Sequence, residues 1–521
     1  MTPEELEEAL GLTPQFDIPA AARRSTRQVG LLASEEGGFA PGSLARQSAS
    51  LVRAVLEKNN GNLVSRWGHI LLRRALVSRF DSPADLDPGD FLAMRVQLLL
   101  RMGEAEAARA MVQDLDSGNF TLPLTDAAFD AYVATGDFTG ICPVMRTQAD
   151  ARDDAQWETA GNICQAFRGN SRGALRNLDR ALRREEMPQI DLLLAQKYAG
   201  AAGNVRRAVT IEWDDVDGMN PWRHGMALAV GLEPPQNLVE NSRDARLFEA
   251  QAVLSPALGL ASRARAADVA AAAGVLSSEA MVDLYSQIYA APDVEGEWND
   301  RAERLRGAYV LADPAARLSA MQELWNETDN ATARYARQVL TAFAAARLPV
   351  ADAFAQNAGD LIASMLTAGL DRDAAQWAET VDDGSLGWAL VQVSRPGDTG
   401  TVDTGDLDTF FDNDESSEAR KSAFLLAGLA GLGRIDEGDA ADFASSLDID
   451  LTAETRWTRI LESAVNAQNP AMVALLASLG MQGGSWDKMT PRYLYRIVSA
   501  LRRSGMEAEA RMIAAEAVAR G

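Results

Sequence analysis

The chain has 521 residues, of which 47 % are hydrophobic and 24 % are charged. This length exceeds what one compact core needs, so we expect several domains or an extended repeat array. The net charge of −24 argues against a nucleic-acid partner, because a protein that neutralises phosphates needs a basic surface. A basic partner protein would fit the acidic surface better.

Residues 1–43 show little periodicity and predict a partly ordered N-terminal arm. The first ten residues resemble the start of an acidic amphipathic helix rather than a signal peptide, which predicts a cytoplasmic protein. A signal removed from this N-terminus is the alternative interpretation. No run of eighteen apolar residues occurs, so no transmembrane segment is expected.

Residues 44–394 predict an array of paired helices. The clearest unit is Phe91–Leu115, in which an apolar stripe, a turn and a second stripe follow one another at helical spacing: Leu92, Val96 and Leu99, then Gly103 and Glu104, then Ala108 and Val112. Small residues in the second stripe let two helices approach closely. The segment therefore predicts a helix–turn–helix unit.

Both cysteines, Cys142 and Cys164, lie within one such predicted unit. If they lie on adjacent antiparallel helices, a disulfide between them is within geometric reach. The other interpretation is a pair of free cysteines that serve as small core residues. Two cysteines are too few for a zinc site, and no Cys/His cluster has the spacing of metal ligands, so neither a metal nor a cofactor is predicted.

Residues 395–419 form the longest polar interruption and predict an acidic loop, after which residues 420–521 predict helical repeats that continue the array. The acidic side chains of this loop are Asp403, Asp406, Asp408, Asp412, Asp414 and Glu415. Their spacing departs from the register of a calcium-binding EF-hand loop and lacks its closing glutamate. We therefore expect a solvated loop.

The remaining chemical side chains favour structural roles. His69 lies in an apolar stripe and is expected in the core, whereas His224 lies near a loop and is expected to be more exposed. Six tryptophans near helix ends are expected to anchor packing between helices: Trp222, Trp298, Trp325, Trp377, Trp388 and Trp486. A short basic stripe is expected to be a solvated helix face: Arg172, Arg176, Arg180, Arg183 and Arg184. No catalytic residue is assigned.

Three segments resemble the tetratricopeptide pattern of two packed helices. Trp157–Ala181 matches W-x2-[LA]-G-x2-[YC] followed by A-x3-[FL]-x2-A, through Trp157, Ala160, Gly161, Cys164, Ala174, Leu178 and Ala181. Phe91–Leu115 and Arg492–Ala517 match the second half of the pattern. The resemblance implies a divergent tetratricopeptide-like α-solenoid.

The N-terminal third is also similar to a group of uncharacterised alphaproteobacterial helical-repeat proteins. The phrases that carry the similarity are S-R-W-G-H-I-L-L-R-R-A-L, Q-L-L-L-R-M-G-E-A-E-A-A-R-A-M-V, and I-C-P followed by W-x6-C-Q-A-F-x-G. This resemblance implies export to the periplasm for many members, and it supplies no activity and no site residues.

Strand signals are scarce, so we predict an all-α fold, an irregular tetratricopeptide-like solenoid or superhelix. The expected function is a non-enzymatic scaffold of the bacterial cell envelope that binds another protein or a peptide along a concave helical surface. The expected location is the periplasm, with the cytoplasm as the alternative. One alternative is a superhelical accessory protein associated with glycan or peptidoglycan. A second alternative is an all-α enzyme that uses buried carboxylates.

Overall fold

The structure, a computed structural model, describes residue 24 and residues 26–203, 209–397 and 400–521. Nearly all regular structure in these ranges is helical, so the predicted all-α class is confirmed. The exception is a short antiparallel pair, β1 (Gln28–Val29) and β2 (Phe80–Asp81), in which Val29 lies opposite Phe80. Within the described ranges, no helix is long and apolar enough to cross a membrane.

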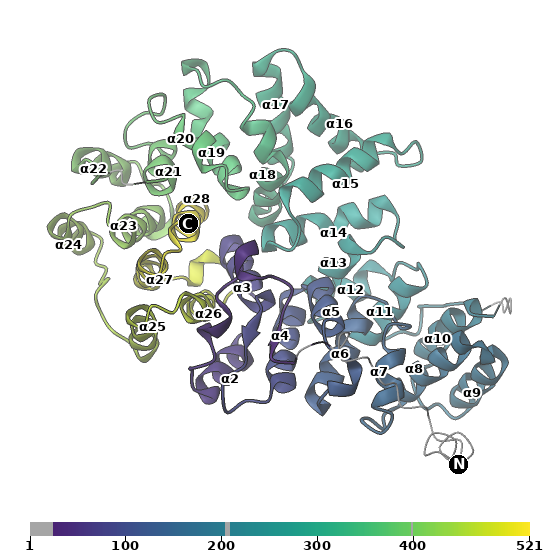
Figure 1. Cartoon of the computed structure of the whole chain (residues 1–521). Coiled ribbons are helices and arrows are strands. Elements are labelled where there is room, and N and C mark those ends of the chain that lie inside the picture. The colour runs from purple at the N-terminus through teal and green to yellow at the C-terminus, as the bar shows by residue number, and fades with distance from the viewer. Residues whose placement is uncertain (1–23, 25, 204–208, 398–399) are drawn as a thin grey trace.

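Helices that follow one another in sequence pack against each other along most of the chain (Figure 1). The N-terminal helices are α2 (Ala49–Lys58), α3 (Arg66–Val77), α4 (Pro88–Met102), α5 (Ala105–Gln113), α6 (Leu122–Ala134), α7 (Cys142–Thr147), α8 (Ala155–Gln165), α9 (Ser171–Arg183) and α10 (Gln189–Ala201). The central helices are α11 (Pro221–Ala229), α12 (Gln236–Glu240), α13 (Ala245–Leu254), α14 (Leu260–Ala273), α15 (Ser278–Ala290), α16 (Glu297–Val310), α17 (Pro314–Trp325), α18 (Ala331–Ala345) and α19 (Ala358–Thr367).

The C-terminal helices are α20 (Asp371–Ala375), α21 (Leu386–Ser394), α22 (Thr404–Asp412), α23 (Arg420–Leu432), α24 (Glu437–Ser446), α25 (Arg456–Asn466), α26 (Pro470–Gly480), α27 (Pro491–Arg503) and α28 (Glu507–Arg520). Short 3-10 turns connect some of the helices: Ser34–Glu36, Pro41–Ser43, Ser117–Asn119, Asp352–Asn357, Ser417–Ala419 and Trp486–Lys488. A π turn, Ala166–Asn170, joins α8 to α9.

The three segments whose sequences resemble the tetratricopeptide pattern each contain two helices joined at a glycine. The pairs are α4 with α5, α8 with α9, and α27 with α28. Gly103, Gly169 and Gly505 stand at the turns with φ of 87°, 98° and 79°. Because a left-handed residue with a side chain costs about 1–2 kcal/mol, glycine lets the chain reverse tightly at these points.

The described part of the predicted N-terminal arm packs against the first helices. Val29 and Phe39 are buried in the main hydrophobic core. The buried guanidinium of Arg95 in α4 donates to the carbonyl of Val29 at 2.9 Å and to that of Leu76 at 2.8 Å, which ties the arm to the end of α3. Residues 1–23 of the predicted arm lie outside the described residues.

Part of the predicted acidic loop 395–419 is helical, so the loop prediction was wrong for residues 404–412. Residues 404–412 form α22, and Asp403 caps its first turn by accepting from the Gly405 amide at 2.8 Å. Leu407 and Phe410 are buried. The loop prediction weighed the many acidic residues and missed that these two apolar residues, three apart, supply one buried helical face.

Helices from the two ends of the chain meet. Figure 1 shows the C-terminal helices α26 and α28 beside the N-terminal helix α3, and both pack against it. The connection continues in the backbone, where the Val64 amide donates to the Met481 carbonyl at 3.0 Å and the Gly483 amide donates to the Asn62 carbonyl at 2.9 Å. The chain is therefore closed on itself rather than open at both ends.

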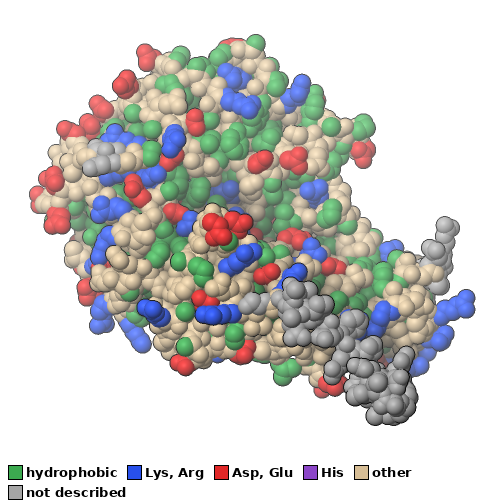
Figure 2. Space-filling model, in the orientation of Figure 1, with side chains coloured by type: hydrophobic (Ala, Val, Ile, Leu, Met, Phe, Trp, Pro, Cys, Tyr) green, Lys and Arg blue, Asp and Glu red, His purple; other side chains and the backbone are tan. Residues whose placement is uncertain are grey.

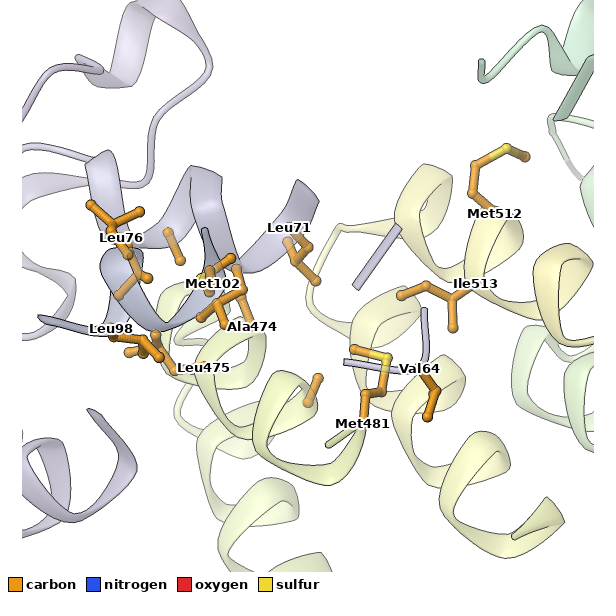
Figure 3. Packing of buried hydrophobic residues seen from close by; sticks show 14 of the residues in the cluster. Val64, Leu71, Leu76, Leu98, Met102, Ala474, Leu475, Met481, Met512 and Ile513 are labelled. Atoms are coloured by element: carbon orange, nitrogen blue, oxygen red, sulfur yellow. The ribbon is translucent and has the colours of Figure 1, made fainter. Parts of the chain in front are cut away.

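Apolar side chains fill the space between the two ends. Figure 3 shows Leu98 and Met102 of α4 next to Ala474 and Leu475 of α26, and Val64 next to Met481. All of these residues belong to one cluster of buried hydrophobic residues. Burial of apolar surface is the main favourable contribution to such a contact, so the closure belongs to the core of the protein.

A polar cluster, which we call the closure junction, fixes the start of α3 and comprises Ser65, Arg66, Trp67 and Glu516. The Glu516 carboxylate of α28 accepts from the Ser65 hydroxyl at 2.6 Å and from the Arg66 and Trp67 amides at 2.9 and 3.3 Å. It thereby satisfies amides that the first turn of a helix cannot pair internally. A side chain near the end of the chain thus caps a helix near its beginning.

The side chains of the closure junction also reach two further helices. The Arg66 guanidinium donates to the carbonyls of Ala271 in α14, Leu276 and Thr367 in α19. The Trp67 indole donates to the Leu366 carbonyl at 3.1 Å. Carbonyls at helix C-termini carry partial negative charge, so a guanidinium is well placed there. Four helices are joined at this point.

Candidate functional site

The structure joins Cys142 and Cys164 in a disulfide, with their Cα atoms 5.5 Å apart. Cys142 begins α7 and Cys164 lies in the last turn of α8, on the face that also buries Trp157. The sequence left two interpretations open, a disulfide or two free cysteines, and the structure contains the disulfide. Its sequence separation is 22 residues, so it links two neighbouring helices within one unit.

Removing this disulfide is expected to lower the free energy of unfolding by about 3 kcal/mol, because the bridge restricts the unfolded chain over a loop of this length. The measurement is urea unfolding of the Cys142→Ala/Cys164→Ala variant against the wild-type protein without reductant. Adding dithiothreitol to both proteins is the control and should remove most of the difference. Equal midpoints without reductant would contradict the prediction.

The two histidines are both 1 % exposed. The prediction that His69 lies in the core is confirmed, and its Nε2 contacts the Glu104 carboxylate at 2.7 Å. Burial lowers the pKa of His69. The expectation that His224 is more exposed was wrong, because α11 packs against α6, α10 and α13 and the His224 ring stacks on Phe248 with 4.4 Å between ring centroids.

The acidic residue Asp414, the six tryptophans and the five arginines of the basic stripe can each be placed in the structure. Asp414 caps α23 by accepting from the Ser422 amide at 2.8 Å, and no group of three or more metal-ligating side chains occurs among the described residues. Five of the six tryptophans are buried, and half-buried Trp298 lies under the Arg301 guanidinium. The five arginines of the basic stripe are all exposed on α9 or just after it.

A groove of about 220 Å³ runs between α15 and α16, and we call it the tyrosine groove. Its lining is Val282, Tyr285, Ser286 and Tyr289 from α15 and Ala302, Leu305, Arg306, Tyr309 and Val310 from α16. The spacing of three to four residues places these side chains on one face of each helix. Tyr289 is 44 % exposed and Val310 is 58 % exposed, so apolar surface is open to solvent along the groove.

Arginines hold the tyrosine rings of this groove. The Arg301 guanidinium donates to the Tyr285 hydroxyl at 3.1 Å, and the guanidinium carbon of Arg306 lies 4.9 Å from the ring centroid of Tyr289. The same two helices carry four exposed acidic residues outside the groove lining: Glu279, Asp283, Glu297 and Glu303. In Figure 2 hydrophobic and acidic side chains adjoin at the tip of α15 and α16, in the upper right of the view.

A second cavity, of about 250 Å³, opens among α11, α12, α13 and α14. Its apolar wall includes Leu228, Val239, Phe248, Ala252 and Leu258. Its polar side chains are His224, Glu233, Gln236, Glu240, Glu249, Ser262 and Arg265. We call it the glutamate cavity, after Glu233, Glu240 and Glu249.

Three side chains of this cavity donate to its own carboxylates. Arg265 and Ser262 both donate to the carboxylate of Glu233, the former at 2.5 Å. The Gln236 amide donates to Glu240. Glu249, by contrast, makes no hydrogen bond or ion pair with any described residue. Burial, with the nearby charge of Glu240, raises the pKa of Glu249.

His224 adds an acceptor to the same cavity. Its Nδ1 donates to the Gln251 side-chain oxygen at 2.9 Å, so its Nε2 carries the lone pair of the neutral ring. That nitrogen has no hydrogen-bond partner in the described part of the chain. Burial lowers the pKa of His224 to about 4, so the ring is neutral at physiological pH. The cavity therefore presents two acceptors, on Glu249 and His224, for which the described residues supply no donor.

Sequence reasoning missed the residues of both sites to different degrees. Tyr285 and Tyr289 are four residues apart, a spacing that puts both on one face of a helix, but the sequence does not show that this face stays uncovered by a neighbouring helix. Glu249 carries no local signal, because it is one of 74 acidic residues and its neighbours come from helices before and after it.

Comparisons of the whole chain with protein-family profiles, with curated proteins and with solved structures find no match in any of the three.

Proposed function

We propose that this chain is a non-enzymatic helical-repeat protein that binds a partner protein, and that the tyrosine groove is its docking surface. The observation that carries the proposal is the exposed apolar face of Tyr289 and Val310 between two helices. Tyrosine and arginine, which line the groove together, are enriched in the energetically dominant parts of protein interfaces.

The geometry favours an amphipathic helix as the docked segment of the partner. Val282 and Tyr289 are seven residues apart on α15, so the groove extends about 11 Å along that helix, or about two turns. A third helix can lay its apolar side chains into the groove between two others. The exposed acidic residues of α15 and α16 and the net charge of −24 favour basic residues beside those apolar side chains.

We further propose a divergent tetratricopeptide-like solenoid located in the bacterial cell envelope. The three helix pairs with glycine at their turns support the repeat assignment. The bridge between Cys142 and Cys164 supports an oxidising compartment such as the periplasm, since cytosolic thiols are kept reduced. Titration of free thiols in protein taken from its native cells tests the location, and two reactive thiols would argue against it.

The docking proposal predicts that Tyr289→Ala weakens partner binding by about 2 kcal/mol, or about thirtyfold in Kd, as expected for a central interface tyrosine. The probe is a labelled amphipathic helical peptide with leucines on one face and lysines beside them, followed by fluorescence anisotropy. Val310→Asp should weaken binding similarly. Leu122→Asp is the matched control, because Leu122 is also exposed but lies on α6.

Binding that is equal for the wild type, Tyr289→Ala and Leu122→Asp would refute the tyrosine groove as the docking surface. A peptide with glutamates in place of the lysines should bind at least tenfold more weakly, and equal binding would refute the charge argument. Light scattering of the free protein adds a further outcome: dimers that Val310→Asp dissociates would show that a second copy, not a different partner, occupies the groove.

A further inference from the structure

We propose that the glutamate cavity is a binding site for an organic cation, that is, an ammonium or guanidinium group carried on a short apolar chain. This site is separate from the tyrosine groove, and the proposal does not depend on the docking function. It follows from the hydrogen-bond inventory, the charge and the shape of the cavity.

The inventory of polar groups selects a ligand that donates hydrogen bonds. Gln236, Ser262 and Arg265 each donate to a carboxylate of the cavity itself, Glu240 or Glu233. The carboxylate of Glu249 and the Nε2 lone pair of His224 have no such donor, and both only accept. Three carboxylates and one guanidinium line the cavity, so an anionic ligand would meet an excess of negative charge, whereas an ammonium or guanidinium group carries several N–H donors for these acceptors.

The charge of the cavity selects a cation. Glu249 is a half-buried carboxylate without a counter-ion in the described structure, and Glu240 lies close enough to repel it. An unpaired carboxylate withdrawn from water is costly, and it is ordinarily paired. Its neighbour Glu233 shows the paired arrangement, with the Arg265 guanidinium at 2.5 Å. A bound cation would supply the missing counter-charge of Glu249.

The wall and the size of the cavity select an organic ligand. Phe248 and Leu258 are buried side chains that offer apolar surface beside the carboxylates. The volume of about 250 Å³ holds about eight water-sized groups at about 30 Å³ each, which is more than a bare metal ion fills. A ligand with a short carbon chain against the apolar wall and a cationic end at Glu249 would complement both the apolar and the acidic side chains of the cavity.

The same chemistry could be supplied by a free small amine or by a lysine or arginine side chain of a polypeptide. The test therefore uses calorimetric titration with two sets of probes. The first set is n-butylammonium and n-butylguanidinium, with neutral butyramide as the isosteric control. The second set is a capped tripeptide with a central arginine, compared with the same peptide with a central citrulline, which keeps the shape and removes the charge.

We expect at least one butyl cation to bind at least tenfold more tightly than butyramide. Glu249→Gln should abolish that preference, while Glu158→Gln, which removes an exposed carboxylate on α8, should preserve it. Glu249→Gln should melt no lower than the wild type, because the variant loses an unpaired charge. A loss of binding in that variant is then a loss of the site rather than of the fold.

The affinity should fall as the pH decreases through the raised pKa of Glu249, because the protonated carboxyl has no charge to offer. Arg265, Glu233 and Glu240 also face the cavity, so the Glu249→Gln variant isolates the contribution of Glu249 and should show a flatter pH profile. Tighter binding of the arginine tripeptide than of the butyl cations assigns the site to a polypeptide side chain, and the reverse assigns it to a small amine.

Three results would overturn the proposal. Equal affinities of butyramide and the cations would make the site merely apolar. Displacement of the cations by micromolar Mg²⁺ or Zn²⁺ would make it a metal site. An equal loss of binding in Glu249→Gln and Glu158→Gln would make the effect one of general surface charge.

Discussion

Replacing Glu516 with alanine is expected to lower the free energy of unfolding by about 3–5 kcal/mol, among the largest effects of a single substitution in this protein. Glu516 is only 5 % exposed, and its carboxylate serves the Ser65 hydroxyl, the Arg66 and Trp67 amides and the Arg520 guanidinium. Alanine would remove the acceptor of the buried Ser65 hydroxyl and of the buried Arg66 amide, and unpaired buried groups cost more than the bonds contributed.

The measurement is urea unfolding followed by circular dichroism. Glu509→Ala is the matched control. Glu509 also lies on α28 and pairs with Arg74 of α3, but its side chain is more exposed than that of Glu516. This substitution should lower the free energy of unfolding by about 1 kcal/mol or less. Glu516→Gln keeps one acceptor oxygen and should fall between the two. A loss for Glu516→Ala no larger than that for Glu509→Ala would show that the closure junction contributes little.

Closure of the array also bears on both candidate sites, through α14. The first half of α14 lines the glutamate cavity with Ser262 and Arg265, and the Ala271 carbonyl in its last turn accepts from Arg66 of the closure junction. The next helix, α15, forms one side of the tyrosine groove. The surfaces proposed for binding therefore belong to helices that the closure holds in place, which favours preformed sites.

The sequence predicted the local structure well because the signals for helices are local. The apolar period of α4 and the glycine after it are visible within 25 residues, and the structure has both features there. Closure is different. Ser65 and Glu516 are 451 residues apart, and no local sequence pattern at either residue indicates that the two are in contact. The apolar face of an amphipathic helix at either end of the chain shows that another element must cover it, but not which element does so.

The candidate sites show the same limit. Helical spacing brought Cys142 and Cys164 close enough for a bridge to be considered, because both lie in one local unit. His224 was misjudged because its burial comes from α6, α10 and α13 rather than from adjacent residues. Glu249 stands out only when the donors around it are counted. That count requires side-chain positions, not a sequence pattern.

A second large effect is expected at the ion pair of Asp191 and Arg223, which joins α10 to α11. Two hydrogen bonds connect them: Arg223 Nε to Asp191 Oδ1 at 2.9 Å and Arg223 Nη2 to Asp191 Oδ2 at 3.0 Å. Their side chains are only 2 % and 8 % exposed. Asp191→Ala should lower the free energy of unfolding by about 3–5 kcal/mol, since it leaves a buried guanidinium without its counter-ion.

The Asp191→Leu/Arg223→Met double variant tests whether the loss in Asp191→Ala comes from the unpaired buried guanidinium or from the lost contact itself. Replacing both charges removes the desolvation cost along with the attraction, so the double variant should lose less stability than Asp191→Ala alone. The bidentate pair of Glu462 and Arg503 is the control, because its side chains are 42 % and 41 % exposed; Glu462→Ala should cost less than about 1 kcal/mol. If the double variant loses at least as much stability as Asp191→Ala, the attraction within the pair outweighs its desolvation, and the pair stabilises the fold by itself. If the double variant recovers stability, the pair instead fixes how α11, which carries His224, docks on α10.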